Sequence, residues 1–356
     1  MSGRQEQFSG EEAPPAHLVL DLDRLAGWLS SRLPGMDRDL SATKFKGGQS
    51  NPTYHLKGPG GSYVLRRKPP GKLVASAHQI DREYRILSAL AGTGLPTPRP
   101  YLYCADEGVI GSEFYIVEHV AGRVFWEADM GDTPPADRAA VYDDMNRVVA
   151  ALHDLDPQAI GLGDLARTGD YAARNLARWS KIYVQSALEQ IDDMDWLIAT
   201  LPSHLPANEQ TTFIHGDYGL YNLIIDPVEP KVRAVLDWEM ATLGDPLIDL
   251  AHHLRAWWDL PDSGLAATSL AGLDLPALGI PAMDDYVAAY CRRRGIAVPD
   301  MRWYLAYAQF RYGAMVQGIL KRAADGTAAS RVMVHSQDRV VKIAAMARRT
   351  LEGLTG

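Results

Sequence analysis

The spacing of apolar residues divides this chain into a strand-rich first third and a helical remainder. Apolar residues recur every three or four positions over 18–33, which predicts an amphipathic helix. Alternating residues in 44–56 and 63–66, separated by a glycine-containing turn, predict two strands joined by a hairpin. Helical spacing returns over 80–90 and ends in a stretch rich in proline and glycine. The first part of the chain is therefore expected to combine strands with a few helices.

The period of the apolar pattern changes near Gly122. Two further strands are predicted before this point, around 101–105 and 113–120, and from Val141 onward the spacing is that of helices. The later helical segments are separated by turns that contain proline or glycine: 171–201, 283–294, 302–323 and 331–354. This succession predicts an α+β, bilobed architecture with a small β-rich N-lobe and a large, mainly helical C-lobe. We expect a flexible N-terminus over 1–16, an N-lobe over 17–122 and a C-lobe over 123–356.

The composition is that of a folded enzyme. Of the 356 residues, 47% are hydrophobic and 22% are charged, which excludes a disordered or fibrous chain. A formal charge of −8 argues against binding to nucleic acid or to an anionic membrane. Two cysteines, Cys104 and Cys291, make neither a disulfide framework nor a zinc pattern. Because the N-terminus is polar and no apolar run is long enough to span a membrane, we expect a cytoplasmic protein.

The residues best suited to chemistry lie in one short stretch near the middle of the chain. An apolar strand predicted over 213–214 is followed by a polar loop that runs from His215 to Asn222 and contains Asp217. The strand resumes over 223–225. The loop is therefore expected to present a carboxylate and an amide at the end of a strand.

A second carboxylate follows on the next strand. The alternating residues of 231–236 predict the second arm of a hairpin, which brings Asp237 beside the same loop. Magnesium prefers oxygen ligands and usually takes one or two carboxylates together with phosphate oxygens, so Asn222 and Asp237 are candidate magnesium ligands. Asp217 is then left to accept a proton from a hydroxyl group.

These residues resemble the signature of a known family. A His-Gly-Asp-x-x-x-x-Asn run at 215–222 is followed by Leu-Asp-Trp-Glu at 236–239 and by Gly-Asp-Pro-Leu-Ile-Asp at 244–249. This set is similar to the aminoglycoside phosphotransferase family, whose fold is protein-kinase-like. The resemblance implies a small-molecule kinase that uses ATP and magnesium.

The resemblance also implies a role for each residue of the stretch. Asp217 would be the catalytic base, Asn222 and Asp237 would hold magnesium, and His215 and Asp249 would brace the loop. Taken alone, each Asp or Asn has an ordinary alternative as a turn or helix-capping residue. The spacing of the whole set favours the catalytic interpretation.

The N-lobe is expected to bind ATP. Arg66 stands where the fold's phosphate-pairing lysine is expected, Lys68 lies on the same face of that strand, and Glu83 is the expected helix partner of the cation. Backbone groups of Glu118 and Val120 are expected to meet the adenine. A glycine-rich turn is expected to cover the phosphates with its amides, or else to be an ordinary hairpin turn: Gly47, Gly48, Gln49, Ser50 and Asn51.

The acceptor is harder to assign, because this fold serves kinases of many small molecules. Four runs, at 47–54, 64–71, 77–84 and 236–247, resemble the kinase domain of acyl-CoA dehydrogenase family members 10 and 11, and the resemblance extends from about Thr43 to Ala251. It implies a hydroxyacyl-CoA as the acceptor. Basic residues at 292–294 or 321–322 would then meet the CoA phosphates, unless they are solvated helix faces.

Two other functions remain open. An aminoglycoside or amino alcohol would need clustered acids, for which four residues are candidates: Asp259, Asp262, Asp284 and Asp285. A nucleotide-binding pseudokinase or regulatory module is favoured only by Arg66. His153 is expected to be a core or capping histidine, and His252 and His253 are not assigned to a metal. No oligomeric state is indicated.

Overall fold

A computed structural model describes residues 3–47, 51–69, 79–166, 169–207, 210–260, 269–326 and 336–355. Within these residues the chain forms two compact units. Unit 1 comprises Met1–Trp126 and Leu220–Met240, and unit 2 comprises Glu127–Gly219 and Ala241–Gly356. None of the helices in the described ranges combines the length and apolar character needed to cross a bilayer.

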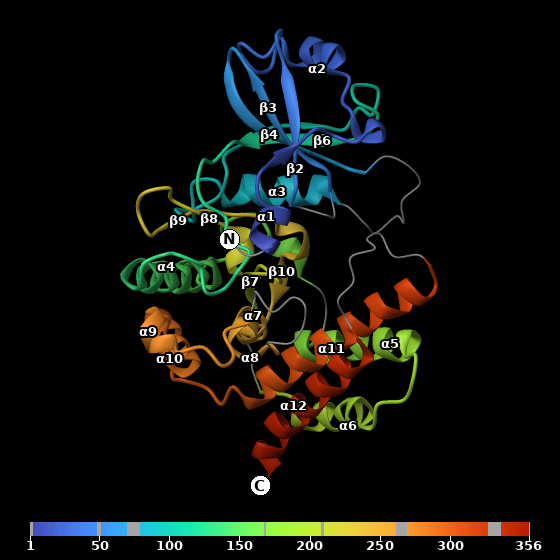
Figure 1. Cartoon of the computed structure of the whole chain (residues 1–356), viewed down its shortest axis with the longest axis vertical. Helices are drawn as coiled ribbons and strands as arrows, with labels where there is room; N and C mark the ends of the chain where they lie inside the picture. The colour runs from blue at the N-terminus through green and yellow to red at the C-terminus, as the bar shows by residue number, and fades with distance from the viewer. Residues whose placement is uncertain are drawn as a thin grey trace. The chain divides into compact units, whose positions relative to one another are not determined.

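Unit 1 is built on an antiparallel sheet with the strand order β1-β2-β3-β4-β6-β5 (Figure 1). Its strands are β1 (Glu11–Glu12), β2 (Ser41–Phe45), β3 (Thr53–Gly58), β4 (Gly61–Arg67), β5 (Pro100–Cys104) and β6 (Phe114–Glu118). Its helices are α1 (Gly3–Phe8), α2 (Leu22–Leu29) and α3 (Ile80–Leu90), and a separate hairpin joins β8 (Leu223–Ile225) to β9 (Val232–Val235).

Side-chain alternation along β4 gives the sheet two different faces. Leu65 belongs to an apolar cluster that includes Leu25 and Leu29 of α2, so this helix covers one face. The next residue, Arg66, points to the other face and pairs with Glu83 of α3. Neighbouring residues of one strand therefore serve the core and the polar side of the sheet.

Unit 2 is mainly helical. Its helices are α4 (Pro135–His153), α5 (Tyr171–Ser186), α6 (Asp192–Thr200), α7 (Pro246–His253), α8 (Arg255–Trp258), α9 (Leu275–Leu278), α10 (Met283–Arg294), α11 (Arg302–Ala324) and α12 (Gln337–Thr355). A two-stranded sheet of β7 (Thr212–Ile214) and β10 (Thr242–Gly244) lies among them. Helix α11 packs against α5, α7 and α12, so it is the central helix of its group (Figure 1).

The predicted α+β fold class, with strands first and helices afterwards, is confirmed. The helices expected over 80–90 and 283–294 have these bounds in the structure. The helix expected over 18–33 is shorter and spans Leu22–Leu29. Its N-terminus is fixed by the Asp21 side chain, which accepts a hydrogen bond from the Arg24 amide. The division into lobes at 17–122 and 123–356 stays a prediction. So does the flexibility of 1–16, although its described part holds α1 and β1.

Candidate active site

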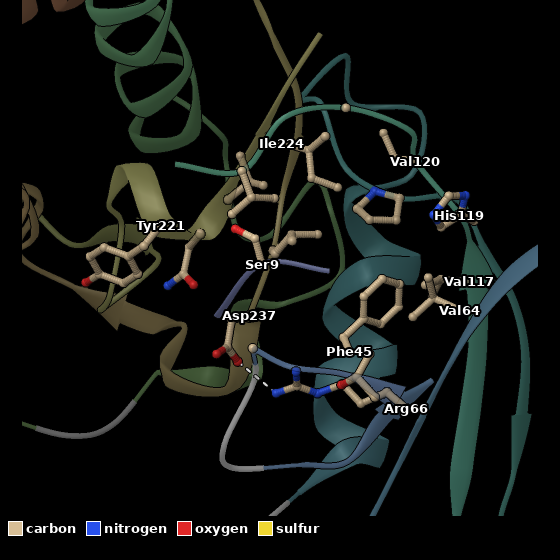
Figure 2. Close-up of a pocket in the computed structure, with 18 of the residues that line it drawn as sticks. Ser9, Phe45, Val64, Arg66, Val117, His119, Val120, Tyr221, Ile224 and Asp237 are labelled. Atoms are coloured by element: carbon tan, nitrogen blue, oxygen red, sulfur yellow. Dashed lines mark hydrogen bonds and ion pairs between the residues drawn. The ribbon is translucent and has the colours of Figure 1, made fainter. Parts of the chain in front are cut away.

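Unit 1 contains a cavity of about 710 Å³, a size suited to a small-molecule ligand. Its apolar walls include Val64 of β4 and Val117 of β6, and Arg66 and Asp237 supply charged groups (Figure 2). Asn222 lines the same cavity. Strand β4, strand β6 and the β8–β9 hairpin therefore combine an apolar wall with a polar end.

Arg66 is the centre of this polar end. It is 7% exposed, and its Nε lies 3.1 Å from Glu83 Oε2. Its Nη2 donates to Asp237 Oδ1 at 2.8 Å (Figure 2). The same nitrogen lies 3.7 Å from Glu239 Oε2. Three carboxylates thus surround a single guanidinium.

This arrangement shifts the pKa values of its members. Burial raises the pKa of Glu83 to about 7. The positive charge of Arg66 lowers this pKa, whereas the negative charges of Asp237 and Glu239 raise it further. Burial alone would lower the pKa of Arg66, but the surrounding acids outweigh it and hold that pKa above its ordinary value. The cluster has an excess of negative charge, and Glu83 is where a proton is most easily taken up.

Asp237 combines a carboxylate that lines the cavity with an unusual backbone. Its φ of 63° lies in the left-handed region, where Asp and Asn are enriched among residues other than glycine. The preceding amide, of Leu236, donates to the carbonyl of Asn222 at 2.8 Å. This bond fixes the two strand ends, so that Asn222 and Asp237 both face the cavity.

The other residues predicted to bind nucleotide are distributed as follows. Glu118 and Val120 line the cavity, as does Gly47, whereas Asn51 is buried. Gly48, Gln49 and Ser50 lie outside the described residues. Lys68 is not among the residues that line the cavity, and its Nζ lies 3.1 Å from Glu113 Oε1.

An unexpected part of the cavity wall comes from the beginning of the chain. The Gln5 side chain accepts from the Trp126 amide at 3.0 Å and donates to the Val124 carbonyl at 2.8 Å. The Phe8 and Trp126 rings are 5.1 Å apart, and Glu11 pairs with Phe45 in the register of β1 and β2. Sequence reasoning missed this wall, because the short polar segment lacks the apolar period of a core element.

In unit 2, Asp249 of α7 holds the loop that follows β7. Its two carboxylate oxygens accept from the amides of His215 at 2.9 Å and Gly216 at 2.7 Å, and His153 Nε2 lies 3.1 Å from Oδ2. Burial opposes the charge of this fully buried side chain, but the hydrogen bonds from His153 and His215 outweigh it and keep the pKa of Asp249 below its ordinary value. Gly216 has a φ of +82°, which favours glycine at this turn.

Asp217 is the carboxylate that this loop presents. Its side chain is 36% exposed, whereas that of Asp249 is fully buried. Its Oδ1 lies 3.1 Å from His252 Nε2, and its amide donates to His215 Nδ1 at 3.2 Å. Burial and then Arg311 lower the pKa of His252, which favours a neutral imidazole that donates to Asp217.

His252 and Arg311 are the contacts of the loop that sequence reasoning did not assign. Arg311 of α11 donates to the Gly216 carbonyl at 3.2 Å. The position of His252, three residues after Asp249 on a predicted helix, was an available signal, because residues at this spacing share a helix face. Arg311 had no such signal, since 95 residues separate it from Gly216.

Two groups of predicted residues have other partners. Arg293 and Arg294 of α10 form ion pairs with Asp143 at 2.6 Å and Asp154 at 2.8 Å. Asp259 is buried in an ion pair with Arg339. Asp284 and Asp285 lie in the first turn of α10, and Asp262 is outside the described residues.

A model of the phosphotransferase enzyme family matches residues 41–307. The chain belongs to this family. The predicted membership of the aminoglycoside phosphotransferase family is thereby confirmed.

Curated relatives of this phosphotransferase confirm the predicted branch. It is 37% identical to acyl-CoA dehydrogenase family member 11 of Rattus norvegicus over 96% of the chain, and 40% identical to acyl-CoA dehydrogenase family member 10 of Mus musculus over 81%. The matches cover 45% and 27% of those two proteins. The phosphotransferase thus spans less than half the length of these relatives.

Solved structures agree with the fold. A candidate aminoglycoside phosphotransferase from Ralstonia eutropha is 43% identical with a TM-score of 0.85, and the match covers 94% of this chain and 99% of that one. A spectinomycin phosphotransferase in complex with ADP and its antibiotic is 12% identical with a TM-score of 0.59, over 92% of this chain and 98% of that one, and supports the fold alone.

Proposed function

We propose that this phosphotransferase is an ATP-dependent small-molecule kinase that transfers the γ-phosphate to an acceptor hydroxyl. The observation that carries the proposal is the contrast between Asp217 of the catalytic loop and Asp249 of α7, which holds that loop. Asp249 is buried and spends both oxygens on loop amides, whereas Asp217 keeps a partly exposed carboxylate on a fixed backbone. Asp217 is thus suited to accept the hydroxyl proton as the base.

ATP is proposed to bind in the cavity of unit 1. The apolar walls suit the adenine ring, and Arg66 supplies a buried cation for the phosphates. Asn222 and Asp237 offer the oxygen ligands that magnesium prefers, and both line the cavity. Magnesium bound there would neutralise phosphate charge. The chain's own contribution is to orient the nucleotide and to position these oxygens.

The acceptor is proposed to be a hydroxyacyl-CoA. Support comes from the relatives, which are named as acyl-CoA dehydrogenase family members and extend well beyond the part matched here. The proposal includes recognition of the acyl-CoA by this chain and a cytoplasmic location of the protein. Aminoglycosides and amino alcohols are the competing acceptors.

The test is phosphate transfer from ATP with magnesium to a panel of hydroxyacyl-CoAs, amino sugars and amino alcohols. Wild type is compared with Asp217→Asn and with the control Asp284→Asn, an exposed aspartate on α10. Transfer to a hydroxyacyl-CoA by wild type and the control, with loss in Asp217→Asn, is expected. If ATP binds to wild type but no acceptor is phosphorylated, the chain is a nucleotide-binding module and the kinase proposal is wrong.

A further inference from the structure

Two neighbouring helices of unit 2 carry positive charge without any acid. Helix α5 contains Arg174, Arg178 and Lys181, and helix α11 contains four basic residues, while neither sequence includes Asp or Glu. The whole chain has the opposite balance, with 44 acidic and 36 basic residues. The two helices pack against each other (Figure 1).

Two of these cations share one aromatic neighbour. The guanidinium carbons of Arg178 and Arg311 lie 5.9 Å and 5.4 Å from the same ring, that of Trp179. Other basic residues of α11 are engaged by acids, as Arg302 is with Asp300 at 2.5 Å. Among the described residues, neither Arg178 nor Arg311 lies within ion-pair distance of a carboxylate. Their charge is available to a ligand.

Arg311 lies beside the catalytic loop. Arg311 donates to the Gly216 carbonyl, and the next residue, Asp217, contacts His252. Arg311 on α11 and Arg255 on α8 both act electrostatically on His252, the partner of Asp217. A polycationic acceptor would be repelled here, whereas an anionic acceptor would be attracted.

The acids that a polycation would need are engaged or lie elsewhere. Asp259 pairs with Arg339, and Asp284 and Asp285 belong to the first turn of α10. The basic run at 292–294 does not offer an equivalent anion site, because two of its arginines pair with acids of α4.

We propose that Arg178 and Arg311 form a binding site for an anionic group of the acceptor, a phosphate or a carboxylate, so that the acceptor's hydroxyl group reaches Asp217. A guanidinium binds either oxyanion through two parallel N–H donors, and the Trp179 ring limits the movement of both side chains. This inference rests on the proposed function, since it concerns the acceptor of that reaction.

The experiment is calorimetric titration of the full chain with the nucleotide site saturated by ADP and magnesium. The probes are 3-hydroxybutyryl-CoA, which carries phosphates, 3-hydroxybutyrate, which carries a carboxylate, 3-hydroxybutyryl-pantetheine, which is uncharged, and kanamycin, which is a polycation. Arg178→Gln is the informative variant because Arg178 is exposed and its loss should not disturb the core. The matched control is Arg302→Gln, a basic residue of α11 that already has an acidic partner.

Wild type and the control are expected to bind at least one anionic probe more tightly than the uncharged probe. Arg178→Gln should weaken that binding about tenfold, the loss of one charge-assisted contact, and should leave the uncharged probe unaffected. If the substitution weakens binding of the CoA ester, the site binds a phosphate; if it weakens binding of 3-hydroxybutyrate, the site binds a carboxylate. The anion site is wrong if wild type binds no anionic probe, or if Arg178→Gln binds the anionic probes as wild type does.

Failure of this inference differs from failure of the proposed function. If 3-hydroxybutyryl-CoA or 3-hydroxybutyrate is phosphorylated equally well by wild type and Arg178→Gln, the kinase proposal stands and the anion site is wrong. If binding of an anionic probe depends on Arg178 but no acceptor is phosphorylated, the anion site stands and the kinase proposal fails.

Discussion

The three carboxylates around Arg66 predict that one of them binds a proton near neutral pH. The substitution that tests this is Glu83→Gln, which preserves the size of a fully buried side chain and removes one negative charge beside the guanidinium. The nucleotide-free protein is the state to examine, since a bound nucleotide would change the charge of the cavity.

The magnitude follows from the pKa shift. The pKa of Glu83 is raised to about 7 in the folded protein from an ordinary value of 4.5. Because the pKa of Glu83 is higher in the folded than in the unfolded state, its protonation stabilises the fold. This stabilisation is fully present below pH 4.5 and is lost as the pH rises through 7. Between pH 5.5 and pH 8 the loss amounts to about 2 kcal/mol of opening free energy.

Hydrogen–deuterium exchange of the amides of β4 and β6 measures the opening free energy of unit 1 by itself. When the pH is raised from 5.5 to 8, the opening free energy of wild type should fall by about 2 kcal/mol more than that of Glu83→Gln. Burial lowers the pKa of His119, which acts with the opposite sign, but His119 is common to both proteins and cancels in the difference. Glu229→Gln, on an exposed turn, is the control and should behave as wild type.

An equal pH dependence in wild type and Glu83→Gln would refute this reasoning. It would mean that Arg66 keeps Glu83 ionised throughout this range despite the burial and the two neighbouring acids.

Three further predictions concern unit 2. Asp217→Asn should lower turnover by about 10²- to 10⁴-fold with little change in ATP affinity, measured by steady-state kinetics and by nucleotide titration; unchanged turnover would exclude it as the base. His252→Ala should lower kcat and shift the acid limb of its pH profile, because Asp217 loses a hydrogen-bond donor, whereas His252→Gln should restore most of the rate; identical pH profiles would leave His252 a purely structural role. Burial lowers the pKa of His253 to about 4, so its contribution to stability is present above pH 6.5 and is lost as the pH falls toward 4. Between pH 7.5 and pH 5, hydrogen exchange of the α7 amides should therefore show about 2 kcal/mol less destabilisation in His253→Phe than in wild type. An equal loss of stability in both proteins would contradict the lowered pKa.

Local patterns predicted much of the fold because they act within one element. The helix over 80–90 and the hairpin that delivers Asp237 follow from apolar spacing and turn residues, which need no knowledge of the rest of the chain. Strand β10 was not predicted, because its three residues form a strand only by pairing with β7. Such short elements have no period of their own.

The same distinction applies to the site. Motif spacing placed Asp217, Asn222 and Asp237 in the predicted set, since the spacing of a catalytic loop is a property of the sequence. The contacts of Arg66 with Glu239 and of Arg311 with Gly216 join residues 173 and 95 positions apart. No local pattern encodes such pairs. The roles of the site residues stay predictions until the substitutions above are measured.

The contacts of Gln5 and Phe8 with the segment at 124–126 have a practical consequence for protein production. Gln5, Phe8 and Glu11 line the proposed nucleotide cavity, and Gln5 satisfies a backbone amide and a carbonyl that would otherwise need new partners. A truncation that removes Gln5 to Glu11 therefore removes part of the binding site itself. Nucleotide affinities measured on such a truncation should be compared with those of the full sequence.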